Sequence, residues 1–356
     1  MRIKNPLLLV CMYFLCSALQ AQDFGTEQGD LFQDQGWYGS PESAIVAEKV
    51  LMLQHENGGW PTDIRFYKNE WSGAEKAKCV VLKSELEETT IDNGATYSEM
   101  IFLAKMFQAT KKEVYKVSFW KGLDFIYSLQ YENGGFKQFA RTKGYFTHIT
   151  FNDNATLNVL QLLRGISEGK ELFNGITDDV QKGRAKKAFN KGIQCILKTQ
   201  YIQNGKRTVW CAQHDEYTLL PAKARAHELP SLSGSESVGL VQLLMDIPNP
   251  GQDIKNAIVG AVEWFAQNRI KDHRVEKFVN AEGKPDIRWI AGTEGDDLWG
   301  RFYELDTNRP FVCDRAGIIK HDLSEIGYEY RNGYEWYTNA PLIVLKNFEG
   351  WKKGNL

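Results

Sequence analysis

Two aspartate–asparagine pairs stand in matching phrases of the chain. TIDNGAT, from Thr90, contains Asp92, and FNDNAT, from Phe151, contains Asp153. Each phrase leads into an apolar run, so one interpretation is that these residues cap helices, since aspartate and asparagine are favoured at the N-cap position. The other is that the carboxylates hold a hard cation such as calcium, or contact a substrate, because such cations prefer carboxylate and amide oxygens. Both interpretations stay open, and they are compatible.

A second set of candidate residues is mostly basic. Its members are Lys223, Arg225, His227 and Glu228 in PAKARAHELP, and Arg309 and Arg315 in TNRPFVCDRAG. Pro230 disfavours regular helix immediately before it, so the first group belongs to a loop. Guanidinium groups bind carboxylates through two parallel hydrogen bonds, which would suit an anionic sugar such as a polyuronate. The alternative is ordinary solvated surface charge.

Missing motifs exclude several other chemistries. The chain has no phosphate-binding G-x-x-x-x-G-K-[ST], no G-x-S-x-G nucleophile elbow and no H-E-x-x-H zinc motif. Its 43 Lys and Arg residues nearly balance its 45 Asp and Glu residues, which gives a formal net charge of −2. That balance argues against nucleic acid as a partner.

We expect the protein to be a monomer.

The elements that must position these residues are helices arranged in repeats. LQHENGGW at 53–60 returns as LQYENGGF at 129–136, each after an apolar helical pattern and before one of the aspartate phrases. A more divergent third copy, AFNKGIQCILKTQYIQNGK followed by LSGSESVGLVQLLMDI, aligns Gln200 with Gln54 and Gln130. The spacing of apolar residues predicts a helix on each side of every such loop.

Three helical hairpins of this kind bury their apolar faces best against one another. The sequence therefore predicts an all-α fold, an (α/α) toroid of three helical-hairpin repeats, in one domain over residues 36–354. Long loops would form a cleft at one end, where Asp92 and Asp153 would meet. The segment 284–317 shows neither helical nor strand periodicity, so we expect a long irregular loop with a functional role there.

The first 22 residues are typical of a secretory signal peptide. Arg2 and Lys4 precede the apolar run PLLLVCMYFLCSAL, and small residues follow before cleavage near Ala21 or Gln22. No later apolar run approaches the ~18 residues of a membrane span, so we expect a secreted or periplasmic protein. The remaining cysteines are Cys79, Cys195, Cys211 and Cys313. Their spacing leaves open whether one or two disulfides form.

Taken together, the phrases resemble the pectate lyases of polysaccharide lyase family ten. The resemblance rests on ENGGWP, TIDNGAT, FNDNAT, KARAHELPSLSGSES, FYELDTNRPFVCDRAG and YRNGYEWY, which occur in this order and cover nearly the whole mature chain. It implies an (α/α) toroid with a cleft, dependence on Ca²⁺, and cleavage of polygalacturonate or pectate oligosaccharides by β-elimination.

The resemblance also implies roles for individual residues. Asp92 and Asp153 match acidic positions that hold calcium and substrate, and Arg225 matches the arginine proposed as catalytic base. The residues that fall in stretches binding substrate carboxylates are Lys223, Arg301, Arg309 and Arg315. His227 stands where related sequences have tyrosine. Because the pKa of arginine ordinarily exceeds ~12, we expect neighbouring positive charge to lower the pKa of Arg225 and activity to rise in alkaline solution.

Two other functions compete with this one. An inverting glycoside hydrolase would use Asp92 and Asp153 as acid and base, with their carboxyl groups ~6.5–9.5 Å apart. A helical-repeat protein could instead bind glycans without cleaving them. A lyase releases an unsaturated sugar that absorbs ultraviolet light, whereas a hydrolase produces only new reducing ends and a binding protein leaves the polymer unchanged.

Overall fold

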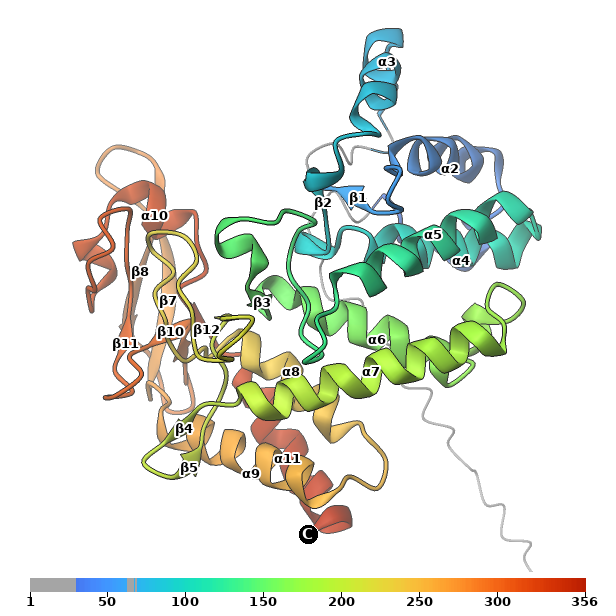
Figure 1. The fold of residues 1–356 in the computed structure, drawn as a ribbon. Coiled ribbons are helices and arrows are strands. Elements are labelled where there is room, and N and C mark those ends of the chain that lie inside the picture. Colours follow the sequence, from blue (N-terminus) through green and yellow to red (C-terminus); the bar gives the residue numbers. More distant parts are fainter. Residues whose placement is uncertain (1–29, 63–66, 68) are drawn as a thin grey trace, which may run out of the picture.

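Helices come in pairs in the computed structural model, which describes residues 30–62, 67 and 69–356 (Figure 1). Each pair has a first helix, a loop and a second helix. The first helices are α2 (Pro41–Leu53), α5 (Glu113–Leu129), α7 (Asp179–Thr199) and α9 (Gln252–Gln267). The second helices are α4 (Tyr97–Thr110), α6 (Ala155–Ser167), α8 (Glu236–Met245) and α11 (Pro341–Asn355). The predicted signal peptide, residues 1–22, lies outside the described residues.

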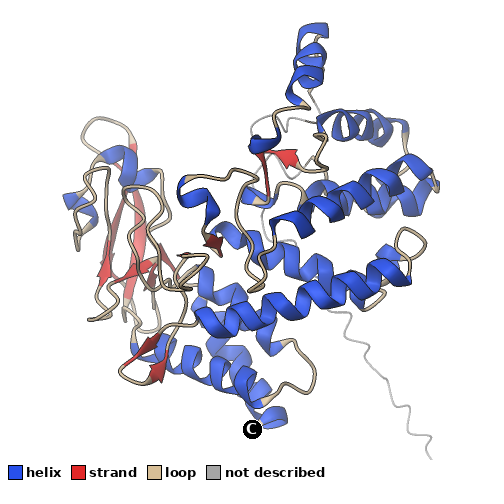
Figure 2. Cartoon of the chain, viewed as in Figure 1, coloured by secondary structure: helices blue, strands red, loops and turns tan. Residues whose placement is uncertain are grey.

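The second helices form a continuous layer. α4 contacts α6, α6 contacts α8 and α8 contacts α11, while α9 packs against both α7 and α11. Helices make up most of the ordered structure, and the strands are short (Figure 2). The predicted all-α fold, an α/α toroid, is confirmed. All three predicted hairpins are present, and α9 with α11 adds a fourth pair within the described residues.

The repeated Leu-Gln ties each pair to the next. The side-chain amide of Gln54 donates to Gly58 O in its own loop (2.9 Å) and to Ser118 O on α5 (2.9 Å). Gln130 donates likewise to Gly134 O (3.1 Å) and to Ala188 O on α7 (2.9 Å). In the third pair Gln200 donates to Thr208 O (2.7 Å) and Ala257 O on α9 (2.8 Å). Since one glutamine satisfies two backbone carbonyls at every junction, the repeat preserves it.

The Gly-Gly that follows has a steric reason. Gly58 has a φ of 92°, and a Cβ there would lie 2.1 Å from Lys121 O on α5. Gly134 has a φ of 96°, and its Cβ would lie 2.0 Å from Lys191 O on α7. Both the left-handed backbone and the close approach of the next helix therefore require glycine.

Short antiparallel strands connect the loops at one end of the helix pairs. They pair as β1 (Trp60–Pro61) with β2 (Thr89–Thr90), β3 (Ile149–Thr150) with β6 (Gln213–His214), β9 (Trp299–Gly300) with β12 (Tyr337–Thr338), β4 (Ile202–Gln203) with β5 (Lys206–Arg207), and β10 (Phe302–Tyr303) with β11 (Pro310–Phe311). Two further helices lie in the loops, α3 (Gly73–Leu82) and α10 (Tyr328–Asn332). One strand of each of the first two pairs, β2 and β3, immediately precedes a turn that carries a candidate aspartate.

The prediction of a wholly irregular segment over 284–317 is wrong. β8 (Pro285–Ala291) pairs along its whole length with β7 (His273–Val279), and β9 to β11 follow within the same stretch. The alternation of apolar residues is hidden because the buried position of β8 holds a charged residue, Asp286. Its carboxylate accepts hydrogen bonds from Nε and Nη2 of Arg331 (2.7 and 2.8 Å), which compensates its burial.

The apolar interior has two parts. The main core joins residues of all four helix pairs, from Leu31 to Val344, and a smaller cluster around Phe302 and Trp336 lies within the strand-rich loops before α11. All four cysteines left after the predicted cleavage are buried with free thiols, so no disulfide forms among them. Among the described helices, none is both long and apolar enough to cross a membrane.

Candidate active site

Asp92 and Asp153 lie on two short 3₁₀ turns that contact each other. These are η3 (Asp92–Gly94), before α4, and η5 (Asn152–Asn154), before α6. Asn93 has φ 47° and ψ 34°, and Asp153 has φ 47° and ψ 35°. The two turns therefore correspond with an offset of one residue. Asp153 occupies the place of Asn93, and Asp92 the place of Asn152.

Neither aspartate caps a helix. The N-cap residues of α4 and α6 are Thr96 and Asn154, and no side chain makes a capping hydrogen bond at either position. The capping interpretation is therefore wrong for Asp92 and Asp153. Instead, the Oδ1 atom of Asp92 is buried and has no hydrogen-bond partner. A buried acceptor without a partner is unfavourable unless a ligand satisfies it.

The charge of Asp92 is strongly perturbed by its surroundings. Burial, with a smaller contribution from the nearby Asp153 carboxylate, raises the pKa of this carboxyl to about 6, against the lowering effects of a Gln138 hydrogen bond and of Arg225. The structure thus brings Asp92, Asp153 and Arg225 into one electrostatic neighbourhood. Two carboxylates close enough to raise each other's proton affinity favour positive charge between them.

Arg301 joins three helix pairs through one nitrogen. Its Nη2 donates to Asn152 Oδ1 and to Asp153 Oδ1, both at 3.0 Å, and forms an ion pair with Glu236 Oε1 at 2.5 Å. The residue is 8% exposed, and its guanidinium carbon lies 4.5 Å from the ring centroid of Tyr334. Burial alone would lower the pKa of Arg301, but Glu236, Tyr334 and Asp153 outweigh it and raise the pKa. Arg301 therefore stays charged and fixes Asp153.

Arg225 is held by a buried carboxylate three residues further along. Glu228 accepts from the backbone N of Arg225 (3.0 Å) and from its Nη2 (2.5 Å), and the hydroxyl of Tyr334 donates to the same carboxylate (3.0 Å). Glu228 is 7% exposed, whereas nearly half of the Arg225 side chain is exposed. This loop therefore presents one end of a guanidinium to solvent beside the two aspartates.

Comparisons with known proteins identify the family of the chain. A sequence model of the family described as pectic acid lyase matches residues 54–345. The chain belongs to the pectic acid lyase family. Two solved structures of the family 10 polysaccharide lyase from Cellvibrio cellulosa resemble it, each with 34% sequence identity over 89% of this chain and 95% of theirs. Their TM-scores are 0.76 for the lyase itself and 0.75 for an aspartate-to-alanine mutant in complex with trigalacturonic acid. No curated protein sequence matches.

The surroundings of Arg225 in this lyase favour a raised pKa, opposite to the lowering expected from the sequence. The hydrogen bond that Arg225 donates to Glu228 is the main influence and, together with the charge of Glu228, raises the pKa of Arg225 against the effect of burial. The sequence argument considered only neighbouring cations. It missed Glu228 as a partner because the i, i+3 contact depends on a turn in a segment without helical periodicity.

The other predicted basic residues take different positions. Lys223 is exposed and lies two residues from Arg225 on the same loop. Arg315 is exposed, and its Nε donates to the Tyr330 hydroxyl (2.6 Å). Its loop touches the Arg225 loop, since a Cβ on Gly317 would lie 3.3 Å from Ala226 O.

Arg309 lies in the turn between β10 and β11, and its side chain is exposed. The neighbouring Asn308 accepts from the Trp264 indole on α9 (2.9 Å) and donates to Gln203 on β4 (2.7 Å). This turn is thus anchored on α9 and β4, whereas the Arg225 loop is anchored on Tyr334. No contact recorded among the described residues joins Arg309 to Arg225.

His227 is part of an aromatic cluster. It is 8% exposed, and its ring lies edge-on between Tyr330 and Tyr334, with centroid distances of 5.2 and 5.3 Å. Burial lowers the pKa of this imidazole. His227 therefore supports the two tyrosines that contact Arg315 and Glu228.

Sequence reasoning missed Glu236 and Tyr334 as members of the site. A signal for Glu236 exists in the repeat, because SLSGSES aligns with TIDNGAT and TFNDNAT and places Glu236 where the other copies have alanine. A charged residue at a position that is otherwise alanine indicates a new role. Tyr334 lies in YRNGYEWY, one of the phrases on which the resemblance rests, but nothing in the sequence indicates its contact with Glu228.

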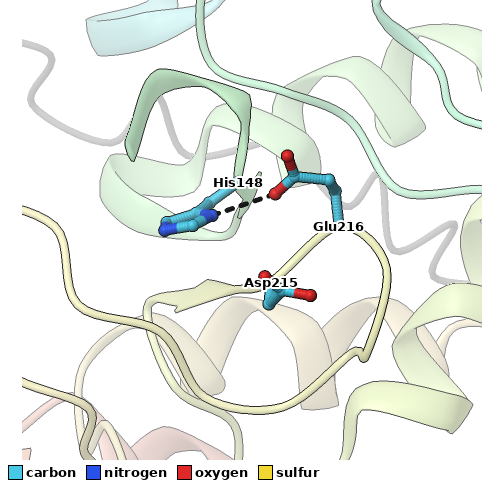
Figure 3. Close-up of side chains that lie close together, drawn as sticks. All are labelled: His148, Asp215 and Glu216. Carbon is cyan, nitrogen blue, oxygen red and sulfur yellow. Dashed lines mark hydrogen bonds and ion pairs between the residues drawn. The ribbon is translucent and has the colours of Figure 1, made fainter. Parts of the chain in front are cut away.

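A histidine and two acids also meet outside this constellation (Figure 3). His148 Nδ1 lies 3.0 Å from Glu216 Oε2, and Asp215 is close enough that one potential ligand atom from each residue falls within 4.8 Å of the others. Asp215 Oδ1 already accepts from Thr218 N (2.7 Å) and from the Thr218 hydroxyl (2.9 Å). These contacts account for the cluster as a link between β6 and the end of η4 (Gly144–Thr147).

Proposed function

We propose that this lyase cleaves polygalacturonate by calcium-assisted β-elimination, with Arg225 as the base. The observation that carries the proposal is the meeting of Asp92, Asp153 and Arg225, three residues from separate loops of the toroid. Membership of the pectic acid lyase family and the likeness to a lyase in complex with trigalacturonic acid support the same substrate.

Asp92 and Asp153 are the residues proposed to hold calcium. The buried Oδ1 of Asp92 has no hydrogen-bond partner, and the facing Asp153 carboxylate raises the pKa of Asp92, so a divalent cation would relieve both penalties. Calcium bound there would neutralise the uronate carboxylate and stabilise the enolate-like charge that develops in the transition state. Arg301 already holds Asp153 in place for this task.

The chemical step breaks the C5–H bond of the uronate. Arg225 in its neutral form accepts the proton, the electron pair forms the C4–C5 double bond, and the C4 oxygen leaves with its sugar and gains a proton from water. Because Glu228 raises the pKa of Arg225, the neutral form is scarce at neutral pH. We therefore expect activity to rise with pH well beyond neutrality.

The exposed Lys223 and Arg315 are proposed to bind substrate carboxylates, since their loops touch the Arg225 loop. Arg309 is proposed to act on a more distant sugar. We propose an indirect role in substrate binding for Arg301, because its charge is matched by Asp153 and Glu236. The protein is further proposed to act as a monomer outside the cytoplasm, as a secreted or periplasmic enzyme.

Product absorbance tests the proposal directly. Polygalacturonate incubated with the enzyme and calcium is expected to gain ultraviolet absorbance from the unsaturated product. EDTA is expected to lower the rate of this gain by at least about 100-fold. Added calcium should restore it. New reducing ends without absorbance would instead indicate the glycoside hydrolase, and unchanged polymer would indicate a glycan-binding protein.

Glu228→Gln provides a test of the pairing with Arg225. Removal of the carboxylate charge should lower the pKa of Arg225, so the rising limb of the rate–pH profile should move to lower pH. At its plateau kcat should fall by about tenfold, because the guanidinium is less firmly oriented. Glu329→Gln is the matched control, since Glu329 pairs with the exposed Arg315 and should leave the profile unchanged. An unmoved profile in Glu228→Gln would contradict the pairing argument.

A further inference from the structure

We propose that the outer face of α7 carries a second binding surface for the polyuronate chain, separate from the catalytic residues. The surface is a shallow hollow of about 590 Å³ on one face of α7, which we call the α7 groove. Its basic lining residues are Lys186, Lys187, Lys191 and Lys198. The inference rests on polygalacturonate being the substrate and adds a site to which no catalytic role is given.

The charge of α7 is unlike that of the rest of the chain. This helix of 21 residues holds six basic residues and one acidic residue, whereas the chain as a whole has a net charge of −2. Helix spacing gathers the positive charge, since residues 187, 191, 194 and 198 follow one another at intervals of three or four. From Lys187 to Lys198 the row spans about 16 Å along the helix axis.

Three of these lysines form no ion pair, although Lys187 lies close enough to Glu132 to lower the pKa of that carboxyl. Lys191 pairs with Glu132 at 2.8 Å. Elsewhere on α7, Arg184 pairs with Asp124 at 3.0 Å and Lys182 with Asp179 at 3.4 Å. The side chains of Lys186, Lys187 and Lys198 are exposed, and none has a hydrogen bond or ion pair among the described residues. Like charges grouped without partners are unfavourable in the free protein, and a ligand with regularly spaced negative charges relieves that repulsion.

The other lining residues suit a sugar. Asn190 and Gln194 supply exposed amides, which both donate to and accept from hydroxyl groups, whereas the amide of Asn133 is engaged by Glu216 O and Gly135 N. The one acidic lining residue, Glu132, is paired with Lys191. No aromatic side chain lines the groove, so it lacks the stacking surfaces with which proteins bind single-stranded nucleic acids. No large apolar side chain lines it either, which a membrane-binding face would require. An anionic polysaccharide is the ligand class that matches both the lysines and the amides.

The groove adjoins the loops of the catalytic end. Asn133 lies at one edge of the groove, and its amide donates to Glu216 O (2.7 Å). Glu216 pairs with His148 at the end of η4 (Figure 3). On η4, Tyr145 interacts electrostatically with Arg225 and Asp92. We expect a polymer that leaves the catalytic residues on this side to meet the α7 groove, and a trisaccharide bound at the catalytic residues to leave the groove free.

The test compares a long and a short substrate. The variant Lys186→Glu, Lys187→Glu, Lys198→Glu is expected to raise KM for polygalacturonate by about tenfold, because three exposed ion pairs with the polymer are lost. KM for trigalacturonate and kcat for both substrates should stay unchanged. Lys346→Glu, Lys352→Glu, Lys353→Glu on α11 reverses the same number of exposed charges and should leave both KM values unchanged.

Binding without turnover separates this proposal from the proposed function. In an Arg225→Ala background, titration calorimetry should show polygalacturonate binding that weakens with added salt and with the α7 substitutions. Unaltered polymer affinity in the triple variant, or an equal loss of trigalacturonate affinity, would overturn the proposal whether or not Arg225 is the base. Single-stranded DNA bound as tightly as polygalacturonate would overturn it too, because the groove would then be a general polyanion site.

Discussion

Arg225→Ala is expected to lower kcat on polygalacturonate by about 10²–10⁴-fold, the range typical of a lost general base. The expected change in KM is smaller, because Lys223 and Arg315 would still bind the substrate. Nearly half of the Arg225 side chain is exposed, so the substitution should leave the fold intact. Stopped ultraviolet assays at saturating calcium, with circular dichroism as the check on folding, measure both effects.

Arg225→Lys is the informative companion to this variant. Lysine keeps the positive charge but cannot reproduce the guanidinium contact with Glu228. If positive charge were all that the reaction needs, Arg225→Lys would retain most of the wild-type rate. We expect it to resemble Arg225→Ala instead. A rate–pH profile of the wild-type enzyme centred below pH ~7, or more than about a tenth of the activity left in Arg225→Ala, would place the base elsewhere.

Asp92→Asn is expected to abolish calcium-dependent activity while it makes the metal-free protein more stable. In the folded state burial and Asp153 raise the pKa of Asp92 from 3.8 to about 6. An acid with a raised folded pKa binds a proton on folding, so the wild type loses stability as pH rises from ~4 to ~6 and stays destabilised above that range. The penalty approaches ~3 kcal/mol at neutral pH. Asparagine has no carboxyl to ionise and so carries no such penalty. The corresponding residue of the second turn is already an asparagine, Asn152.

Urea unfolding in EDTA measures this directly. At pH ~7.5 Asp92→Asn should be more stable than wild type by about 1–3 kcal/mol. At pH ~4 the difference should shrink to about 0.5 kcal/mol or less, because the wild-type carboxyl is then protonated in the folded state and about half protonated in the unfolded state. Asp153→Asn is the matched contrast and should destabilise the protein, since Arg301 would lose one of its two carboxylate partners while it stays buried. A loss of stability in Asp92→Asn at pH ~7.5 would contradict the argument.

The two aspartates occupy similar turns in two repeats but differ in how their charges are compensated. Both lie on turns with nearly identical backbone angles, yet Arg301 neutralises Asp153 while Asp92 keeps a buried oxygen without a partner. If the protein were free of calcium in solution, this difference would be a net penalty. Binding energy from the metal can offset it, because a ligand that binds only the folded state stabilises that state.

The sequence alone determined the helical framework and the identity of its repeated parts. Helical spacing of apolar residues, Leu-Gln at the end of each first helix and Gly-Gly after it are local signals, and each has a local cause in the structure. Gln54 and Gln130 satisfy carbonyls of the next helix, and Gly58 and Gly134 touch its backbone. The fourth pair escaped notice because about 70 residues of strand-rich loops separate α9 from α11 and the Asp-Asn phrase is absent there.

Only the tertiary structure decided the chemical state of the candidate residues. Glu228 and Glu236 stabilise the charges of Arg225 and Arg301, whereas burial and Asp153 disfavour the charge of Asp92. Loop closure brings these partners together, and Tyr334 reaches Glu228 from more than 100 residues away. A sequence records which groups are present but not how deeply they are buried or which charge faces them, and these two quantities set a pKa. For that reason the sequence could name Asp92, Asp153 and Arg225 as candidates, whereas the pairing that holds Arg225 charged could be found only in three dimensions.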